Sequence, residues 1–157
     1  MVVVAILGLL GVLAINIYKR YVLKSKTSEA MTMLAHIKAK QETYQAEHYR
    51  YAHIPDAFPA SIVRGTKVPF TGLPDTWLQL GIQASQNAVY FQYKTESDQG
   101  NPAANNPPVG VGMTNGQTWF TATAYGKFDA DTIDTTYEIV SNRDSVWKVD
   151  RFGNRGP

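Results

Sequence analysis

The feature that most constrains this chain is the apolar run at its start. Met1–Ile15 reads MVVVAILGLLGVLAI and carries no charged, hydroxyl or amide side chain. The run continues past Asn16 to Tyr18 and ends at Lys19. A helix that is apolar on every side needs a cover of lipid or of other protein. We therefore expect residues 1–22 to be the half of a helix that lies in a membrane or in a bundle of helices.

The pattern after residue 22 is typical of an amphipathic helix. Apolar residues recur at spacings of three, four or seven, at Leu23, Ala30, Leu34, Ile37 and Tyr44. This spacing places an apolar stripe on one face of a helix that runs to about residue 48. We expect residues 23–53 to form this second half of the helix. The basic residues that separate the halves are interpreted as a solvated collar beside lipid headgroups: Lys19, Arg20, Lys24 and Lys26.

A membrane-spanning helix explains the apolar run better than a signal peptide does. A signal peptide has basic residues first and a small-residue cleavage site. Here nothing basic precedes the run, and Lys19 and Arg20 stand where the cleavage site would lie. A span needs ~20 apolar residues, so the eighteen from Met1 to Tyr18 are at the short end of the range. A buried core helix is the alternative.

Composition excludes several classes of function. The formal net charge of +2 over 157 residues is too small to predict a nucleic-acid partner, and no specific nucleic-acid site is evident. The absence of cysteine excludes disulfides, thiol nucleophiles and cysteine-ligated zinc. No nucleophile motif, phosphate-binding glycine loop or suitably spaced histidine is present, so we expect no catalytic residue and no enzyme.

The first third of the chain resembles the N-terminal helix of the type IV pilin and pseudopilin family. The resemblance covers roughly residues 1–52 and rests on MVVVAILGLLGVLAINIYKRYVLKSKTSEA. Gly8 matches the helix glycine of the family, and Tyr18 and Tyr21 match its aromatic positions. The chain departs from the family at Asn16, where many members have a proline.

The resemblance implies a structural role in a homo-oligomeric helical filament. The apolar helices would bundle as its core, and a leader peptide and six residues, one of them a glutamate used in assembly, would precede Met1. The monomer would lie in the lipid of the bacterial inner membrane until an assembly platform there adds it, with other pilins, to an extracellular filament. The implied filament-core residues are Val4, Leu7, Gly8, Leu10, Gly11, Leu13, Asn16, Tyr18 and Tyr21.

Two other functions stay open. A pseudopilin of a type II secretion system would form a short periplasmic piston instead of a surface fibre. The absence of the C-terminal disulfide that is common in major pilins agrees with that alternative. A membrane-anchored binding module, with Trp and Tyr side chains at its loops, is the third possibility.

The rest of the chain predicts an antiparallel sheet. Residues 54–87 are rich in Pro and Gly with single aromatic residues between them, which indicates an ordered loop. Residues 88–157 hold the sheet: strands at 88–96 and 118–128, a hairpin over 137–149, and an irregular tail. The expected fold is α+β, with a long N-terminal helix packed on three or four antiparallel strands, as in type IV pilins.

The helix and the sheet are expected to meet through small and apolar side chains. Leu34, Ile37 and Tyr44 lie on the stripe of the helix, and the second strand alternates so that one of its faces is apolar. Small residues on that face would let the helix approach closely. The strand residues of this predicted core are Phe120, Ala122 and Ala124.

A calcium site is the one cofactor that the sequence suggests. Asp129, Asp131 and Asp134 are closely spaced oxygen ligands between two strands. An EF-hand is excluded because the loop lacks the glycine at its sixth position, and a solvated acidic turn is the simpler interpretation. The three histidines, His36, His48 and His53, lack the spacing of a metal site and are interpreted as surface or capping residues.

Overall fold

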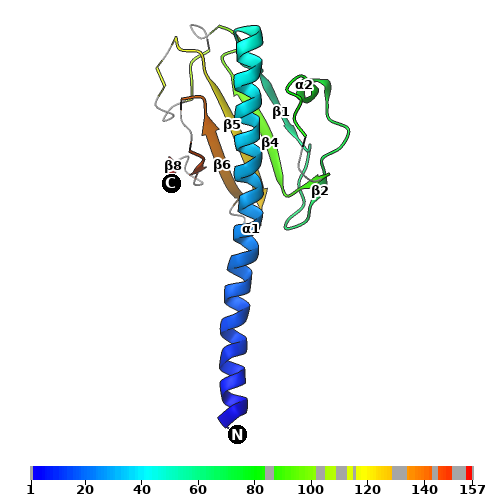
Figure 1. The fold of residues 1–157 in the computed structure, drawn as a ribbon, viewed down its shortest axis with the longest axis vertical. Helices are drawn as coiled ribbons and strands as arrows, with labels where there is room; N and C mark the ends of the chain where they lie inside the picture. The colour runs from blue at the N-terminus through cyan, green and yellow to red at the C-terminus, as the bar shows by residue number, and fades with distance from the viewer. Residues whose placement is uncertain are drawn as a thin grey trace.

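The computed structural model describes residues 2–83, 87–101, 105–108, 113–114, 116–128, 134–142, 145–149 and 155–156. Within these residues it confirms the α+β class, with a helix packed against an antiparallel sheet (Figure 1). The elements are α1 (Val2–His48), β1 (Ile54–Phe58), β2 (Val68–Pro69), α2 (Asp75–Leu78), β3 (Ala88–Val89), β4 (Phe91–Ser97), β5 (Phe120–Lys127), β6 (Asp134–Val140), β7 (Trp147–Val149) and β8 (Arg155–Gly156).

The main sheet has more strands than the sequence predicts. Its order is β1-β4-β5-β6-β7-β8, so the described residues form six antiparallel strands where three or four were expected. Two of the additional strands lie in segments that were expected to be loop or irregular: β1 in the Pro-rich segment and β8 in the tail. Both are short edge strands, and β1 carries a proline, which an edge strand tolerates because one side of it needs no partner.

The helix α1 continues through both of its halves and ends at His48. The next residue, Tyr49, adopts a left-handed φ of 57° and donates its backbone N–H to the carbonyl of Gln45 at 2.8 Å. This geometry closes the last helical turn and redirects the chain toward β1. In Figure 1 the C-terminal half of α1 crosses the face of the sheet, and we call this half together with the described residues after it the head. The N-terminal half of α1 projects away from the head.

The core lies between the second half of α1 and the central strands. Ala30, Leu34 and Ile37 are completely buried at this seam. Opposite them, Ala124 on β5 pairs with Tyr93 on β4 and with Tyr137 on β6. The small side chain at Ala124 leaves room for the helix between these two large rings.

Leu23 corrects the predicted extent of the apolar stripe. It was expected on the packed face, but its side chain is 48% exposed. Hydrogen bonds between α1 and the head lie further along the helix, where Lys26 donates to the Gly65 carbonyl and Thr27 hydrogen-bonds the Tyr137 hydroxyl. Leu23 lies before these contacts, so the sheet does not reach it.

The predicted strand at 88–96 is two strands separated by Tyr90. β3 pairs with β2 in a separate two-stranded sheet, while β4 enters the main sheet. The backbone N–H of Tyr90 is bound at 2.7 Å by the carboxylate of Glu29 on α1. A side chain of the helix therefore takes the place of a strand partner at the point where the chain changes sheets.

The segment 54–87 is more ordered than a loop. Besides β1, β2 and α2, it supplies Trp77, whose side chain is fully buried and whose indole N–H donates to the Asp56 carbonyl at 3.3 Å. Phe70 packs edge-on against Trp77 and Phe58. These aromatic contacts hold the segment beside β4.

Candidate functional site

The projecting half of α1 is the candidate functional surface. Its large apolar side chains have no cover within the described chain: Val2 is 73% exposed, Leu10 56% and Ile17 68%. Residues 2–22, the projecting half, would extend about 32 Å at the ~1.5 Å rise of an α-helix. An exposed apolar surface of this size on a protein marks a site of contact with lipid or with another protein.

The residues that the resemblance assigns to a filament core all lie on this projecting half. Val4, Leu10, Tyr18 and Tyr21 are exposed. At Gly8 and Gly11 an added Cβ would meet no atom within 4 Å. The side chains of Leu7, Leu13 and Asn16 lie outside the described residues. The side chains of this surface that the structure describes therefore point into open space in the single chain.

The mean hydropathy of the helices was compared with that of membrane-spanning helices. Within the residues described, no helical stretch reaches the length and mean hydropathy that crossing a membrane requires.

Lys26 fixes the point at which α1 leaves the head. Its ammonium donates to the Gly65 carbonyl at 3.2 Å and lies 4.6 Å from the ring centroid of Tyr90 and 5.4 Å from that of Phe128. A cation over aromatic rings is attracted by their negative faces. The prediction that Lys26 belongs to a solvated collar is wrong, since its charged end packs on the head.

The predicted helix–sheet core residues gather at the seam above the projecting half. Leu34, Ile37, Phe120, Ala122 and Ala124 are each 0% exposed. Tyr44 is partly buried, and its ring stacks on His48 with centroids 4.1 Å apart.

The predicted calcium ligands cannot be assembled from the described residues. Asp129 and Asp131 lie outside them, and Asp134 begins β6 with a side chain that is not described. Across the part of the chain that the structure describes, no three metal-ligating side chains come together.

The histidines are distributed over three environments. His53 accepts a hydrogen bond from the Ser97 backbone at 3.1 Å, so it links the chain after α1 to the end of β4. His48 lies against Tyr44 at the end of α1. His36 lines a cavity beside α1.

Two polar residues of α1 carry contacts that the apolar periodicity does not reveal. Gln41 is fully buried and its amide bonds both the backbone of Ala52 and the Thr95 hydroxyl. Glu29 holds Tyr90 and pairs with Lys67 at 3.5 Å. The sequence gives one signal for these contacts, which is position. Gln41 lies four residues after Ile37 and therefore on the stripe, and Glu29 lies beside Ala30 at its edge.

Comparisons with known proteins give no assignment: no protein-family model, no curated protein and no solved structure matches the chain.

Proposed function

We propose that this protein is a structural subunit of a type IV filament, a pilin whose projecting helix forms the filament core. The observation that carries the proposal is the apolar half of α1, whose described side chains have no cover in the single chain. The N-terminal sequence supports it, since it resembles the pilin helix over roughly residues 1–52. The same proposal includes the fold of a pilin, in which a helical spine packs on the sheet.

In this proposal the two halves of α1 have different roles. The second half is held to the sheet by the core seam and by the amide of Gln41, so the head keeps its shape whatever surrounds the first half. The first half would lie in the inner membrane before assembly and among the helices of other subunits after it. In both places its apolar side chains avoid water.

The energetics favour assembly by a machine over spontaneous assembly. Lipid tails are as apolar as leucine side chains, so moving a helix from lipid into a bundle gains little hydrophobic free energy. Close packing at small residues such as Gly8 and Gly11 would supply part of the attraction. An energy-driven platform in the inner membrane would supply the remainder.

A pair of matched substitutions tests this function. Leu10 on the projecting half and Leu78 on the head are 56% and 57% exposed. We expect Leu10→Asp to abolish filaments in the native host, because a charge there must be buried in lipid or in the core. Leu78→Asp should leave filaments intact, as seen by electron microscopy of sheared cell surfaces.

Filament formation by Leu10→Asp at the level of the unaltered chain would contradict the proposal. A loss of filaments with both variants would show that any added charge disturbs the subunit. That outcome would also remove the support for a filament-core role of the projecting half. A filament confined to the periplasm, with none on the cell surface, would identify the subunit as a pseudopilin.

A further inference from the structure

The stretch of α1 at residues 23–29, which we call the junction, joins the projecting half to the part of the helix that packs on the sheet. Leu23 at its start is 48% exposed, whereas Ala30 directly after it is completely buried. The described apolar side chains before the junction are uncovered. The direction in which the projecting half leaves the head therefore depends on how firmly the junction is held.

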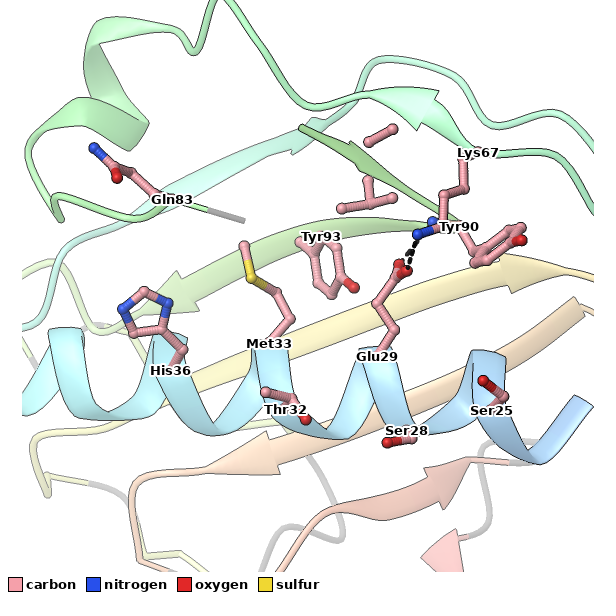
Figure 2. Close-up of a pocket in the computed structure, with 12 residues that line it drawn as sticks. Ser25, Ser28, Glu29, Thr32, Met33, His36, Lys67, Gln83, Tyr90 and Tyr93 are labelled. Carbon is pink, nitrogen blue, oxygen red and sulfur yellow. Dashed lines mark hydrogen bonds and ion pairs between the residues drawn. The ribbon is translucent and has the colours of Figure 1, made fainter. Parts of the chain in front are cut away.

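The junction has a weak sequence for a helix. It reads LKSKTSE, in which Ser25, Thr27 and Ser28 supply three of the seven residues. Serine and threonine have lower helix propensity than alanine, and their hydroxyls compete for helix carbonyls, which often bends the helix. Both serines are exposed, and Figure 2, a view of the cavity on the head beside α1, shows them on the turns next to Glu29. The junction thus has little resistance of its own to bending.

Lys26 ties the middle of the junction to the rest of the head. Its ammonium donates to the Gly65 carbonyl at 3.2 Å and lies 4.6 Å from the ring centroid of Tyr90 and 5.4 Å from that of Phe128. Hydrogen bonds from a charged donor are stronger than neutral ones, and the rings add a cation–π attraction. A bend at the junction that moved Lys26 would have to break these contacts together.

The groups that receive the Lys26 ammonium are themselves fixed. The backbone N–H of Gly65 donates to the Lys127 carbonyl at 3.1 Å, which holds the accepting segment against the end of β5. Phe128 packs on Phe91 of β4, with ring centroids 5.0 Å apart. Lys26 therefore contacts groups that are tied to the central strands of the sheet.

The last residue of the junction is held separately. The carboxylate of Glu29 binds the Tyr90 backbone N–H at 2.7 Å and lies 3.5 Å from the Lys67 ammonium (Figure 2). The hydroxyl of Thr27 lies 3.2 Å from that of Tyr137 on β6. Because these bonds fix the helix from Thr27 onward, a bend is confined to the turn around Lys26.

We propose that the junction is a hinge and that Lys26 locks it, so that the single chain holds its projecting half in one direction. Release of the ammonium from the Gly65 carbonyl and the two rings lets the helix bend at the serines. The head and the projecting half then change their mutual angle while the core stays packed. The proposal concerns the single chain and does not depend on filament assembly.

Pulsed electron paramagnetic resonance on the full chain in detergent tests the hinge. The chain has no cysteine, so nitroxide labels can be attached at pairs of introduced cysteines. Ile15→Cys with Leu78→Cys spans the junction, at side chains that are 58% and 57% exposed. Met31→Cys with Leu78→Cys lies within the head and reports any loosening of the head itself.

Lys26→Met removes the charge and nearly keeps the length of the side chain. It loses the charged hydrogen bond and the cation–π attraction, so we expect bent conformers to become on the order of tenfold more populated. The distance distribution across the junction should broaden, and the distribution within the head should not. Lys24→Met, at an exposed lysine of the same junction, is the matched control and should behave as the unaltered chain does.

Three outcomes would overturn the proposal. An unchanged distribution across the junction in Lys26→Met would show that the helix is rigid without the lock. Equal broadening by Lys24→Met would show that any loss of positive charge has this effect. Broadening of both label pairs would show that Lys26 holds the head together and locks no hinge.

Alanine at the two serines locates the hinge. In the Lys26→Met chain, Ser25→Ala with Ser28→Ala should narrow the distribution again, because alanine favours the straight helix. Thr43→Ala, at an exposed hydroxyl of the packed half of α1, is the control and should leave the distribution broad. A distribution that stays as broad with the two alanines as without them would contradict a hinge at the junction.

Discussion

Gln41 joins three segments of the chain through one buried amide. Its nitrogen donates to the Ala52 carbonyl at 2.8 Å and to the Thr95 hydroxyl at 2.9 Å, and its oxygen accepts from the Ala52 N–H at 2.9 Å. The end of α1, the chain that follows it and β4 are thereby held together. A side chain that is 0% exposed makes these bonds away from water, where an unpaired group costs most.

We expect Gln41→Leu to destabilise the head although leucine is more apolar. The change leaves the backbone groups of Ala52 without partners, at a cost of ~1–3 kcal/mol for each group. Gln45→Leu, four residues along the same helix and only half-buried, is the control and should stay within ~0.5 kcal/mol. Urea unfolding followed by circular dichroism measures both, and equal stability of the two variants would refute the anchoring role of Gln41.

Ile37 and Met31 form a second matched pair on α1. Ile37 is 0% exposed at the seam, whereas Met31 is 45% exposed. Ile37→Ala should lower the free energy of unfolding by ~2–5 kcal/mol, because it empties space that the sheet cannot fill. Met31→Ala should change it by no more than ~0.5 kcal/mol. Similar losses at both positions in the same unfolding experiment would show that the packed face of α1 is assigned wrongly.

Single residues also show what a sequence can predict. The buried apolar residues of α1, such as Leu34 and Ile37, follow from periodicity because an apolar stripe has only one stable place, against the sheet. The burial of Gln41 and the contacts of Glu29 cannot be predicted from this periodicity. Whether a polar side chain is buried depends on partners that lie far away in the sequence, here Thr95 and Tyr90.

At the scale of elements, the central strands can be predicted from the alternation of buried and outward-facing residues, and the edge strands cannot. β4 and β5 each bury one side chain in two over most of their length, a pattern visible in the residues themselves. β1 and β8 were missed because β1 is interrupted by proline and β8 spans two residues. Such short strands exist because a neighbouring strand offers free backbone groups, which local sequence does not record.

The cavity on the head was beyond prediction for the same reason. Its walls come from α1, β3 and β4, and the break in pairing at Tyr90 that shapes it depends on a hydrogen bond from Glu29. The sequence does not show that these distant segments meet.

The glycines of α1 lead to an expectation about the whole element. Because nothing lies within 4 Å of a Cβ added at Gly8 or Gly11, alanine there should stabilise the helix of the single chain by about 1 kcal/mol per position. In a filament the same methyl groups would hinder close helix packing. We expect Gly8→Ala and Gly11→Ala to increase helicity in detergent by circular dichroism and to reduce filament yield.

Alanine at Met31, outside the apolar half, provides the control for these glycine variants. An increase in filament yield with either glycine variant would contradict close packing at that position. Helicity and yield are measured on separate samples, so an effect on folding is distinguished from an effect on assembly.

At the scale of the whole molecule, the chain has two parts that differ in how their apolar side chains are covered. The head buries its own core, while the described apolar side chains of the projecting half of α1 are uncovered. Figure 1 shows the projecting half as an extension of the same helix that crosses the sheet.

The most direct test of this account is a helical reconstruction of filaments from the native host at a resolution that traces the backbone. We predict that residues 2–22 of each copy pack among the same residues of other copies along the axis, with the heads outside. We also predict a loosened stretch between Gly8 and Asn16, where two glycines and a competing side-chain amide weaken the helix. Heads on the axis with the apolar helices facing outward would contradict the central claim, and unbroken helical hydrogen bonding from Gly8 to Tyr21 would contradict the loosened stretch alone.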